Sequence, residues 1–128
     1  MAVSKWANDD VMDAALAEVA TSVMLRVCSG ADNPADRAAA ISATLASVAL
    51  TPGAGNGDFT LANGDSNGRK LTVAQQTDIS ITASGDATIV TLDDGTALQY
   101  VTTCTSQSLT SGGTVTVPAW DIEIADPA

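Results

Sequence analysis

Hydrophobic and polar positions change their spacing once along this chain, near residue 50. Before that point apolar side chains recur at helical spacing, as at Met12, Leu16 and Val19, with alanine between them. From residue 58 onward apolar positions alternate with Ser, Thr and Asp, which is the period of a half-buried strand. The pattern predicts an α+β chain in which N-terminal helical segments precede a mainly antiparallel β-sandwich or small β-barrel.

The first half is predicted to contain a helix, a strand and a second helix within residues 1–50. Asn8 or Asp9 caps the first helix, and alternation over residues 23–28 indicates a short strand. The second helix is expected to have Asn33 as its cap and Pro34 as its first helical position, and to end before Pro52. Its apolar stripe consists of Ile41, Leu45 and Val48.

The second half is predicted to form an antiparallel β-domain over residues 58–128, joined to the first half by a flexible segment at 51–57. Asn-Gly and Asp-Gly pairs separate six alternating runs, and these pairs favour tight turns. In the last run Trp120 and Ile122 share one face, with Asp121 opposite. Pro118 cannot donate to a β-ladder, so this run is expected at a sheet edge or to bend there. We expect the two halves to form one compact unit.

Composition narrows the classes of partner. Of 128 residues, 15 are acidic and 5 are basic, so the formal net charge is -10. Nucleic acids and anionic membranes bind through lysine and arginine, so neither is expected as a partner. Much of the 45% hydrophobic content is alanine, which buries little area. A core this lean predicts self-association or docking on a larger body.

Residues suited to catalysis are scarce. The chain has no histidine, which removes the commonest general base and most zinc sites. Adjacent Asp93 and Asp94 precede a glycine and are interpreted as a turn. Asn63–Gly68 matches the opening of a calcium-binding EF-hand loop, but Ala74 stands where the closing glutamate belongs, so a polar hairpin is expected. We therefore expect no enzyme activity, cofactor or metal.

The cysteines and the N-terminus bear on the compartment. The first residues contain acids early and no long apolar stretch, so no signal peptide is predicted and synthesis in a cytoplasm is expected. In a reducing compartment Cys28 and Cys104 are expected to be free and buried rather than paired.

Four residues are candidates for an interface. Arg69 and Lys70 form the only adjacent basic pair, which is either ordinary surface charge or a contact for an acidic partner. Trp6 and Trp120 are candidate anchors, since tryptophan is enriched at interface hot spots. Trp120 is expected in the core, and for Trp6 core and contact both stay open.

Three stretches carry a resemblance to a known class. MAVSKWANDDVMDAALAEV, GDFTLANGDSNGRKLTV and LQYVTTCTSQSLTSGGTVTVPAWDIEIADP resemble small virion structural proteins of tailed bacteriophages and prophages. The resemblance covers almost the whole chain and carries over no catalytic residue. It implies a homo-oligomer, commonly a trimer, made in the host bacterial cytoplasm and located in the virion.

Within that class the expected function is capsid decoration, or cement, on the outer surface of the head. An acidic β-domain with exposed strand edges suits binding to the major capsid protein by β-augmentation. A head–tail connector or a tail or fibre attachment protein is the first alternative. A carbohydrate-binding β-module on the virion surface is the second, although it would need more exposed aromatic residues than this chain has.

Overall fold

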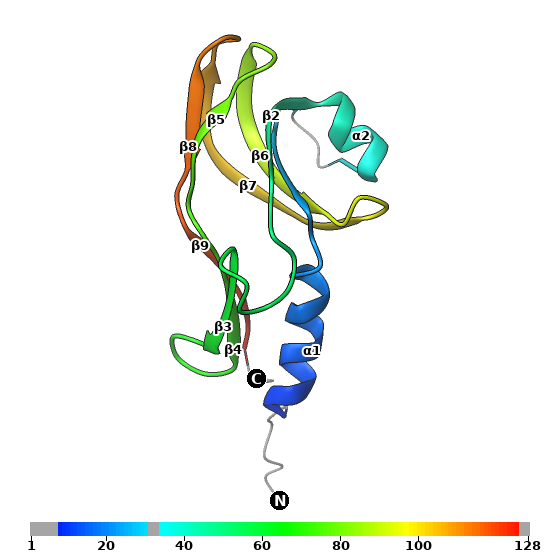
Figure 1. Cartoon of the computed structure of the whole chain (residues 1–128), viewed down its shortest axis with the longest axis vertical. Helices are drawn as coiled ribbons and strands as arrows, with labels where there is room; N and C mark the ends of the chain where they lie inside the picture. Colours follow the sequence, from blue (N-terminus) through cyan, green and yellow to red (C-terminus); the bar gives the residue numbers. More distant parts are fainter. Residues whose placement is uncertain (1–7, 31–33, 126–128) are drawn as a thin grey trace, which may run out of the picture.

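The computed structural model describes residues 8–30 and 34–125 (Figure 1). In order along the chain, its elements are α1 (Asp9–Val19), β1 (Met24–Cys28), α2 (Arg37–Ser42), β2 (Thr44–Ala49), β3 (Phe59–Asn63), β4 (Arg69–Val73), β5 (Gln76–Ser80), β6 (Gly85–Asp93), β7 (Leu98–Leu109), β8 (Thr114–Val117) and β9 (Trp120–Ile124). The architecture is thus mostly β, with a helix at its start, as the sequence predicts.

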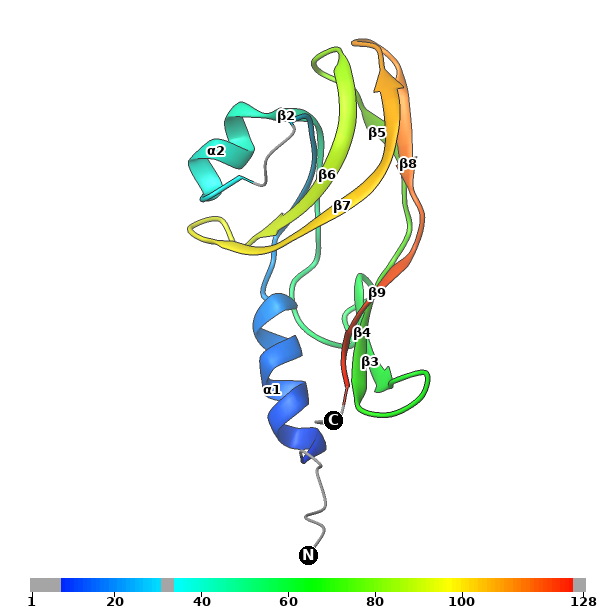
Figure 2. The same ribbon diagram turned by 180° about the vertical axis from the view of Figure 1, so that it is seen from behind.

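The strands form three antiparallel sheets, ordered β2-β1-β6-β7, β3-β4-β9 and β5-β8. A single bridge between Ala46 and Ile81 connects β2 to the end of β5. Strands therefore follow one another in the order β7-β6-β1-β2-β5-β8, and Figure 2 shows β7 and β8 diverging below the turn that joins them. Because β7 and β8 do not pair within the described residues, the strands do not close. The arrangement is sandwich-like, and the barrel alternative is wrong.

The first helix begins where the sequence predicts. The Asn8 side chain accepts a 2.8 Å hydrogen bond from the backbone N–H of Asp10, and two aspartates occupy the first turn. Met12 and Leu16 are buried, while Val19 is half-buried against the core. The helix lies beside β4, near the end of the molecule at which β9 finishes (Figure 1).

The second helix is much shorter than predicted and the prediction is wrong at both ends, because α2 begins at Arg37 rather than at Pro34 and ends at Ser42. Asp36 rather than Asn33 is the cap, and Asn33 itself lies outside the described residues. Residues 44–49 form β2, whose Ala46 and Val48 pair with Val27 and Leu25 of β1. Helical propensity in an alanine-rich segment is a weak preference, and pairing along a neighbouring strand overrides it.

The largest sheet combines both halves of the sequence, because β1 lies between β2 and β6. The predicted strand at 23–28 is confirmed within one residue. The 51–57 segment is tied into the structure. The N–H of Gly53 donates to the carbonyl of Ala20 at 2.8 Å, and the N–H of Thr51 donates to the Asp58 carboxylate at 2.6 Å.

Residues 59–124 contain seven strands rather than six, because the last predicted run is divided at Pro118 and Ala119. Before the division β8 pairs with β5, and after it β9 pairs with β4. Pro118 was expected to place the last run at a sheet edge or to bend it, and both expectations are confirmed. The chain leaves one sheet there, and β8 and β9 are both edge strands.

The interior is filled mainly by aliphatic side chains around Phe59, which is fully buried. One carboxylate is also fully buried. Asp93 accepts hydrogen bonds from Arg26 Nε at 3.0 Å, from Arg37 Nε at 3.1 Å and from the N–H of Gly95 at 3.0 Å. Asp93 is thus an internal ion-pair centre that joins β1, α2 and β6.

Candidate interface between β7 and the β8–β9 edge

Arg69 and Lys70 do not form a free basic patch. Arg69 Nε donates to Asp13 at 2.8 Å, which ties β4 to α1. Lys70 Nζ lies 2.9 Å from Asp65 and 3.6 Å from Asp121. The hydrogen bond to Asp65, followed by the charge of Asp121, raises the pKa of Lys70. Both cations are satisfied within the chain, so the interpretation as surface charge fits better than a contact for an acidic partner.

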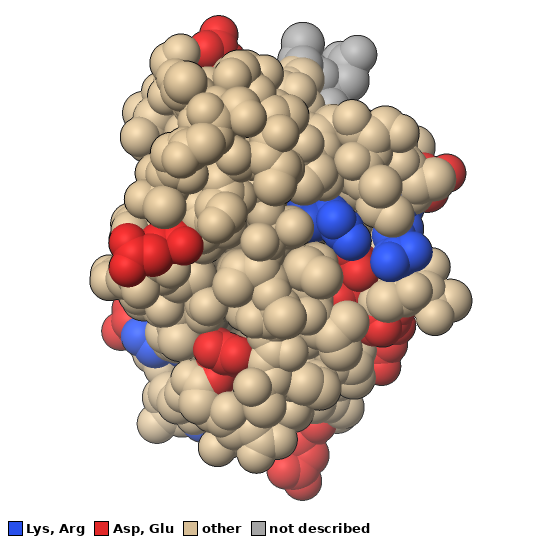
Figure 3. Space-filling model, turned by 45° about the horizontal axis from the view of Figure 1, so that its top comes forward, with Lys and Arg blue, Asp and Glu red and all other residues tan. Residues whose placement is uncertain are grey.

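Every basic residue in the described part of the chain forms an ion pair with a carboxylate. Arg26 and Arg37 are paired with Asp93. On the face shown in Figure 3, basic groups lie next to acidic ones. Lys5 is the remaining basic residue of the sequence, and it lies outside the described residues.

Trp120 is half-buried, in agreement with its predicted core position, and its ring lies 5.9 Å from that of Tyr100 with a tilt of 33°. It shares the inward face of β9 with Ile122, while Asp121 is exposed on the other face. The Trp120 Nε1 atom is buried and has no hydrogen-bond partner among the described residues. A buried indole N–H without an acceptor is costly.

The four candidate interface residues are not brought together as one site. Lys70 lies on the outward face of β4, since it pairs with exposed Glu123, whereas Trp120 faces inward opposite Val73. Trp6 lies outside the described residues. A different candidate site lies in the space beside Trp120.

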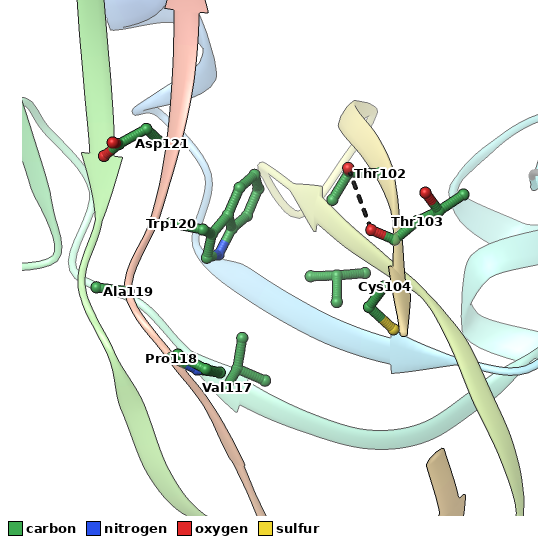
Figure 4. Close-up of a pocket in the computed structure, with 9 residues that line it drawn as sticks. Thr102, Thr103, Cys104, Val117, Pro118, Ala119, Trp120 and Asp121 are labelled. Carbon is green, nitrogen blue, oxygen red and sulfur yellow. Dashed lines mark hydrogen bonds between the residues drawn. The ribbon is translucent and has the colours of Figure 1, made fainter. Parts of the chain in front are cut away.

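That space is an opening between β7 and the continuous edge made by β8 and β9, which we call the β7–β8 cleft. It contains two adjoining cavities of about 330 and about 310 Å³ that share Val90, Cys104, Val117 and Pro118. Figure 4 shows the Trp120 ring extending from β9 toward Thr102 and Cys104 of β7. Val90, which is buried, forms part of the wall of both cavities.

Both walls of the β7–β8 cleft are strand edges without a neighbour in the described structure. An unpaired edge presents backbone N–H and C=O groups that can accept another strand. Residues 95–120 contain no charged side chain, and β7 has neither the lysine nor the proline that commonly protects an exposed edge. The cleft is therefore apolar and hydroxyl-rich, with exposed Asp121 at one end.

The two thiols occupy different environments and are both free, with Cys28 buried and Cys104 exposed in the cleft. The expectation of free thiols is confirmed, and the expectation of burial is wrong for Cys104. Desolvation by burial raises the pKa of the Cys28 thiol, whose Sγ donates to the carbonyl of Ala40 at 3.6 Å. Desolvation also raises the pKa of Cys104.

The two polar turns singled out from the sequence are accounted for by local contacts. In Asn63–Gly68 the Asp65 carboxylate accepts from Lys70 and the Asp65 N–H donates to Glu123 at 2.8 Å. Asp94 accepts from the N–H groups of Ala97 at 2.7 Å and Thr96 at 2.9 Å, and these bonds lower its pKa. Asp94 thus has the predicted turn role, while its neighbour Asp93 is buried.

Sequence reasoning missed Thr102, Cys104 and Val117 as members of one site. Two signals point to them in retrospect. One is the uncharged stretch over residues 95–120 in an acidic chain, and the other is the proline that divides the last strand. Neither signal says which strand stays unpaired.

Within residues 8–30 and 34–125 no group of three or more Cys, Asp or Glu side chains is arranged to hold a metal ion. No helix in those ranges has the length and apolar character needed to cross a membrane. Comparisons with protein-family models, with curated proteins and with solved structures found no significant match to this chain.

Proposed function

We propose that this chain is a non-enzymatic structural protein of a tailed-phage virion, and within the virion a capsid decoration protein that binds the lattice of the major capsid protein. The observation that carries the proposal is the β7–β8 cleft, with two unpaired strand edges and an uncharged lining. Extended polypeptide is the ligand that such edges recognise, because backbone hydrogen bonds supply affinity and alternate side chains enter the pockets.

The chemistry of the rest of the chain supports a binding role over a catalytic one. Its basic side chains in the described part are neutralised by neighbouring carboxylates. Net charge is -10, which disfavours binding to the packaged nucleic acid and favours an exposed position on a particle. The resemblance of three long stretches to small phage virion proteins supplies the biological setting.

In this role each copy bridges neighbouring capsid subunits. One extended segment of a subunit lies along β7, and the pocket beside Trp120 receives an apolar side chain. Repetition over the lattice multiplies a contact that is weak in a single copy, because neighbouring copies raise the effective concentration of each binding group. Apolar area buried between subunits then resists the outward pressure of packaged DNA.

The first experiment measures copy number. Particles from a lysate of the source bacterium are purified by density gradient, and the chain is quantified against the major capsid protein by mass spectrometry. A decoration protein is expected at a copy number close to that of the major capsid protein. A ratio corresponding to one small ring per particle supports the connector alternative, and absence of the chain from particles overturns the assignment to a virion.

The second experiment tests the surface that is used. Thr103→Lys places a charge on the exposed edge of β7, where lysine opposes the addition of a strand. Ile41→Lys is the matched control, since Ile41 is 43% exposed on α2, away from the cleft. Thr103→Lys is expected to be lost from particles while the control is retained. Equal incorporation of both variants contradicts the proposed binding edge.

A further inference from the structure

Three asparagines of this chain are each followed directly by glycine, in the pairs Asn56-Gly57, Asn63-Gly64 and Asn67-Gly68. In such a pair the backbone nitrogen of the glycine can attack the side-chain carbonyl carbon of the asparagine, because glycine has no side chain to block the approach. The attack needs a free N–H, open space around it and a backbone that can rotate to close a ring. The three pairs differ in all of these conditions.

At Asn63 the reacting groups are held by the hairpin between β3 and β4. The N–H of Gly64 donates to the carbonyl of Gly68 at 2.9 Å, and the side-chain oxygen of Asn63 accepts from Arg69 Nη1 at 2.8 Å. Asn63 is also the last residue of β3 and pairs with Arg69 of β4, which fixes its backbone dihedrals. Ring closure at Asn63 therefore requires the hairpin to open first.

At Asn67 the following glycine is enclosed by the backbone of β9. A β-carbon placed on Gly68 would overlap the carbonyl oxygen of Ile124 and would lie 2.8 Å from Cα of Ala125. The carbonyl of Asn67 in turn lies against Gly64, where an added β-carbon would overlap it. The space around this pair is thus already occupied by backbone atoms, and attack at Asn67 also requires the hairpin to open.

The pair Asn56-Gly57 lies in the exposed loop that joins β2 to β3 (Figure 1). The Gly57 N–H has no hydrogen-bond acceptor among the described residues, and a β-carbon placed on Gly57 would meet none of their atoms within 4 Å. The amide nitrogen of Asn56 donates to the carbonyl of Pro52 at 2.9 Å. That bond holds the group that would leave and not the nitrogen that attacks, so no element of the fold has to open for the reaction to begin.

We propose that Asn56 is a site of spontaneous covalent modification, at which the folded chain deamidates. A base from solvent removes the proton of the Gly57 N–H, and this nitrogen bonds to Cγ of Asn56 to form a succinimide ring. The Cγ–Nδ2 bond breaks, and the amide nitrogen takes up a proton from water and leaves as ammonia. Water then opens the ring at either carbonyl. The product is aspartate when the ring nitrogen separates from Cγ, and isoaspartate when it separates from the backbone carbon.

Both products change the contacts of the loop. Each carries a carboxylate, which adds one negative charge to the chain and cannot donate to the carbonyl of Pro52. Isoaspartate also lengthens the backbone by one methylene. The same loop is tied to the end of α1 by the bond from the N–H of Gly53 to the carbonyl of Ala20, so the change occurs in the segment that connects the two halves of the sequence. The proposal does not depend on the virion assignment.

The experiment compares the three pairs within one molecule. Natural full-length protein is incubated at mildly alkaline pH, folded in buffer and, in parallel, unfolded in guanidinium chloride. Samples taken over time are digested briefly with a protease that cleaves before aspartate, since cleavage before Asp58 and Asp65 places the three asparagines in separate peptides. Mass spectrometry of each peptide measures the replacement of ammonia by water, and isoaspartate is recognised because the protease does not cleave before it. A sample that is not incubated corrects for deamidation during digestion.

In the unfolded chain the three asparagines are expected to react at similar rates. In the folded protein Asn56 is expected to keep about its unfolded rate, whereas Asn63 and Asn67 react at least about tenfold more slowly, because hydrogen bonds of the hairpin must open first. Asn56→Gln keeps an amide donor but closes its larger ring far more slowly, so it is expected to remove most of the ammonia released by the folded protein. Asn63→Gln is the matched control and is expected to leave that release unchanged.

Two results overturn the proposal. One is protection of Asn56 in the folded protein as strong as that of Asn63, which would mean that the loop holds the pair apart. The other is a release of ammonia that Asn56→Gln does not lower, or equal rates at all three pairs in the folded protein. Neither result bears on the copy number in particles, so the proposed virion function is decided separately.

Discussion

The buried carboxylate of Asp93 allows a quantitative test of the structure. Asp93→Asn removes the negative charge that two guanidinium groups share, while the amide oxygen keeps one acceptor for the N–H of Gly95. Removing one partner of a fully buried ion pair costs about 3–5 kcal/mol. The cost here is smaller because Arg26 and Arg37 keep 12% and 32% of their side-chain surface in contact with solvent. We expect a loss of about 2–3 kcal/mol in the free energy of unfolding.

Urea unfolding followed by tryptophan fluorescence measures this loss. For an m-value of about 1.5 kcal/mol per molar, the midpoint is expected to fall by about 1.5 M. Asp86→Asn is the matched control, since Asp86 lies on the same strand, is exposed and makes no ion pair within the described residues. Its expected change is within about 0.5 kcal/mol.

A double-mutant cycle with Arg26→Met separates the ion pair from other effects of the substitution. If the pair contributes as the geometry indicates, Asp93→Asn costs less in the Arg26→Met background by at least about 0.5 kcal/mol. Equal midpoints for Asp93→Asn and Asp86→Asn, or a cycle without coupling, would falsify the buried ion-pair centre.

Three further outcomes are expected. Leu45→Ala removes a buried side chain of β2 and is expected to lower the free energy of unfolding by about 2–4 kcal/mol. Ile41→Ala on α2 is the control and is expected to change it little, because Ile41 is exposed. Equal effects of the two substitutions in thermal unfolding would favour the long helix that the sequence predicts. The pKa of the Asp94 carboxyl lies below its ordinary value of 3.8, because the carboxylate accepts backbone hydrogen bonds. These hydrogen bonds therefore contribute to the free energy of unfolding above that pH, and the contribution is lost as the pH falls through the lowered pKa. Natural protein should lose more stability than Asp94→Asn between about pH 5 and about pH 3 in urea titrations, and parallel curves contradict this. In dilute reduced protein one thiol, Cys104, should react rapidly with a disulfide reagent and Cys28 only on unfolding; two fast thiols would contradict the burial of Cys28.

Local patterns determined the elements whose ends are set by adjacent residues. Asn8 caps α1 because its side chain reaches the N–H of Asp10 two residues away. Alternation along β9 buries Ile122 and exposes Asp121, since successive strand side chains point to opposite faces. Pro118 ends β8 because it has no N–H for the ladder. Each of these outcomes depends on contacts within a few residues and is readable from the sequence.

Pairing between distant segments decided the rest. The sequence by itself determined the α+β class, the first helix, most strand positions and the acidic, histidine-free character of the chain. Only the tertiary structure decided that residues 44–49 become β2, that Asp93 is buried between two arginines, and that β7 and β8 stay unpaired to leave a cleft. The physical reason is that hydrogen bonds and burial gained from a partner strand far along the chain outweigh local preferences of well under one kcal/mol per residue.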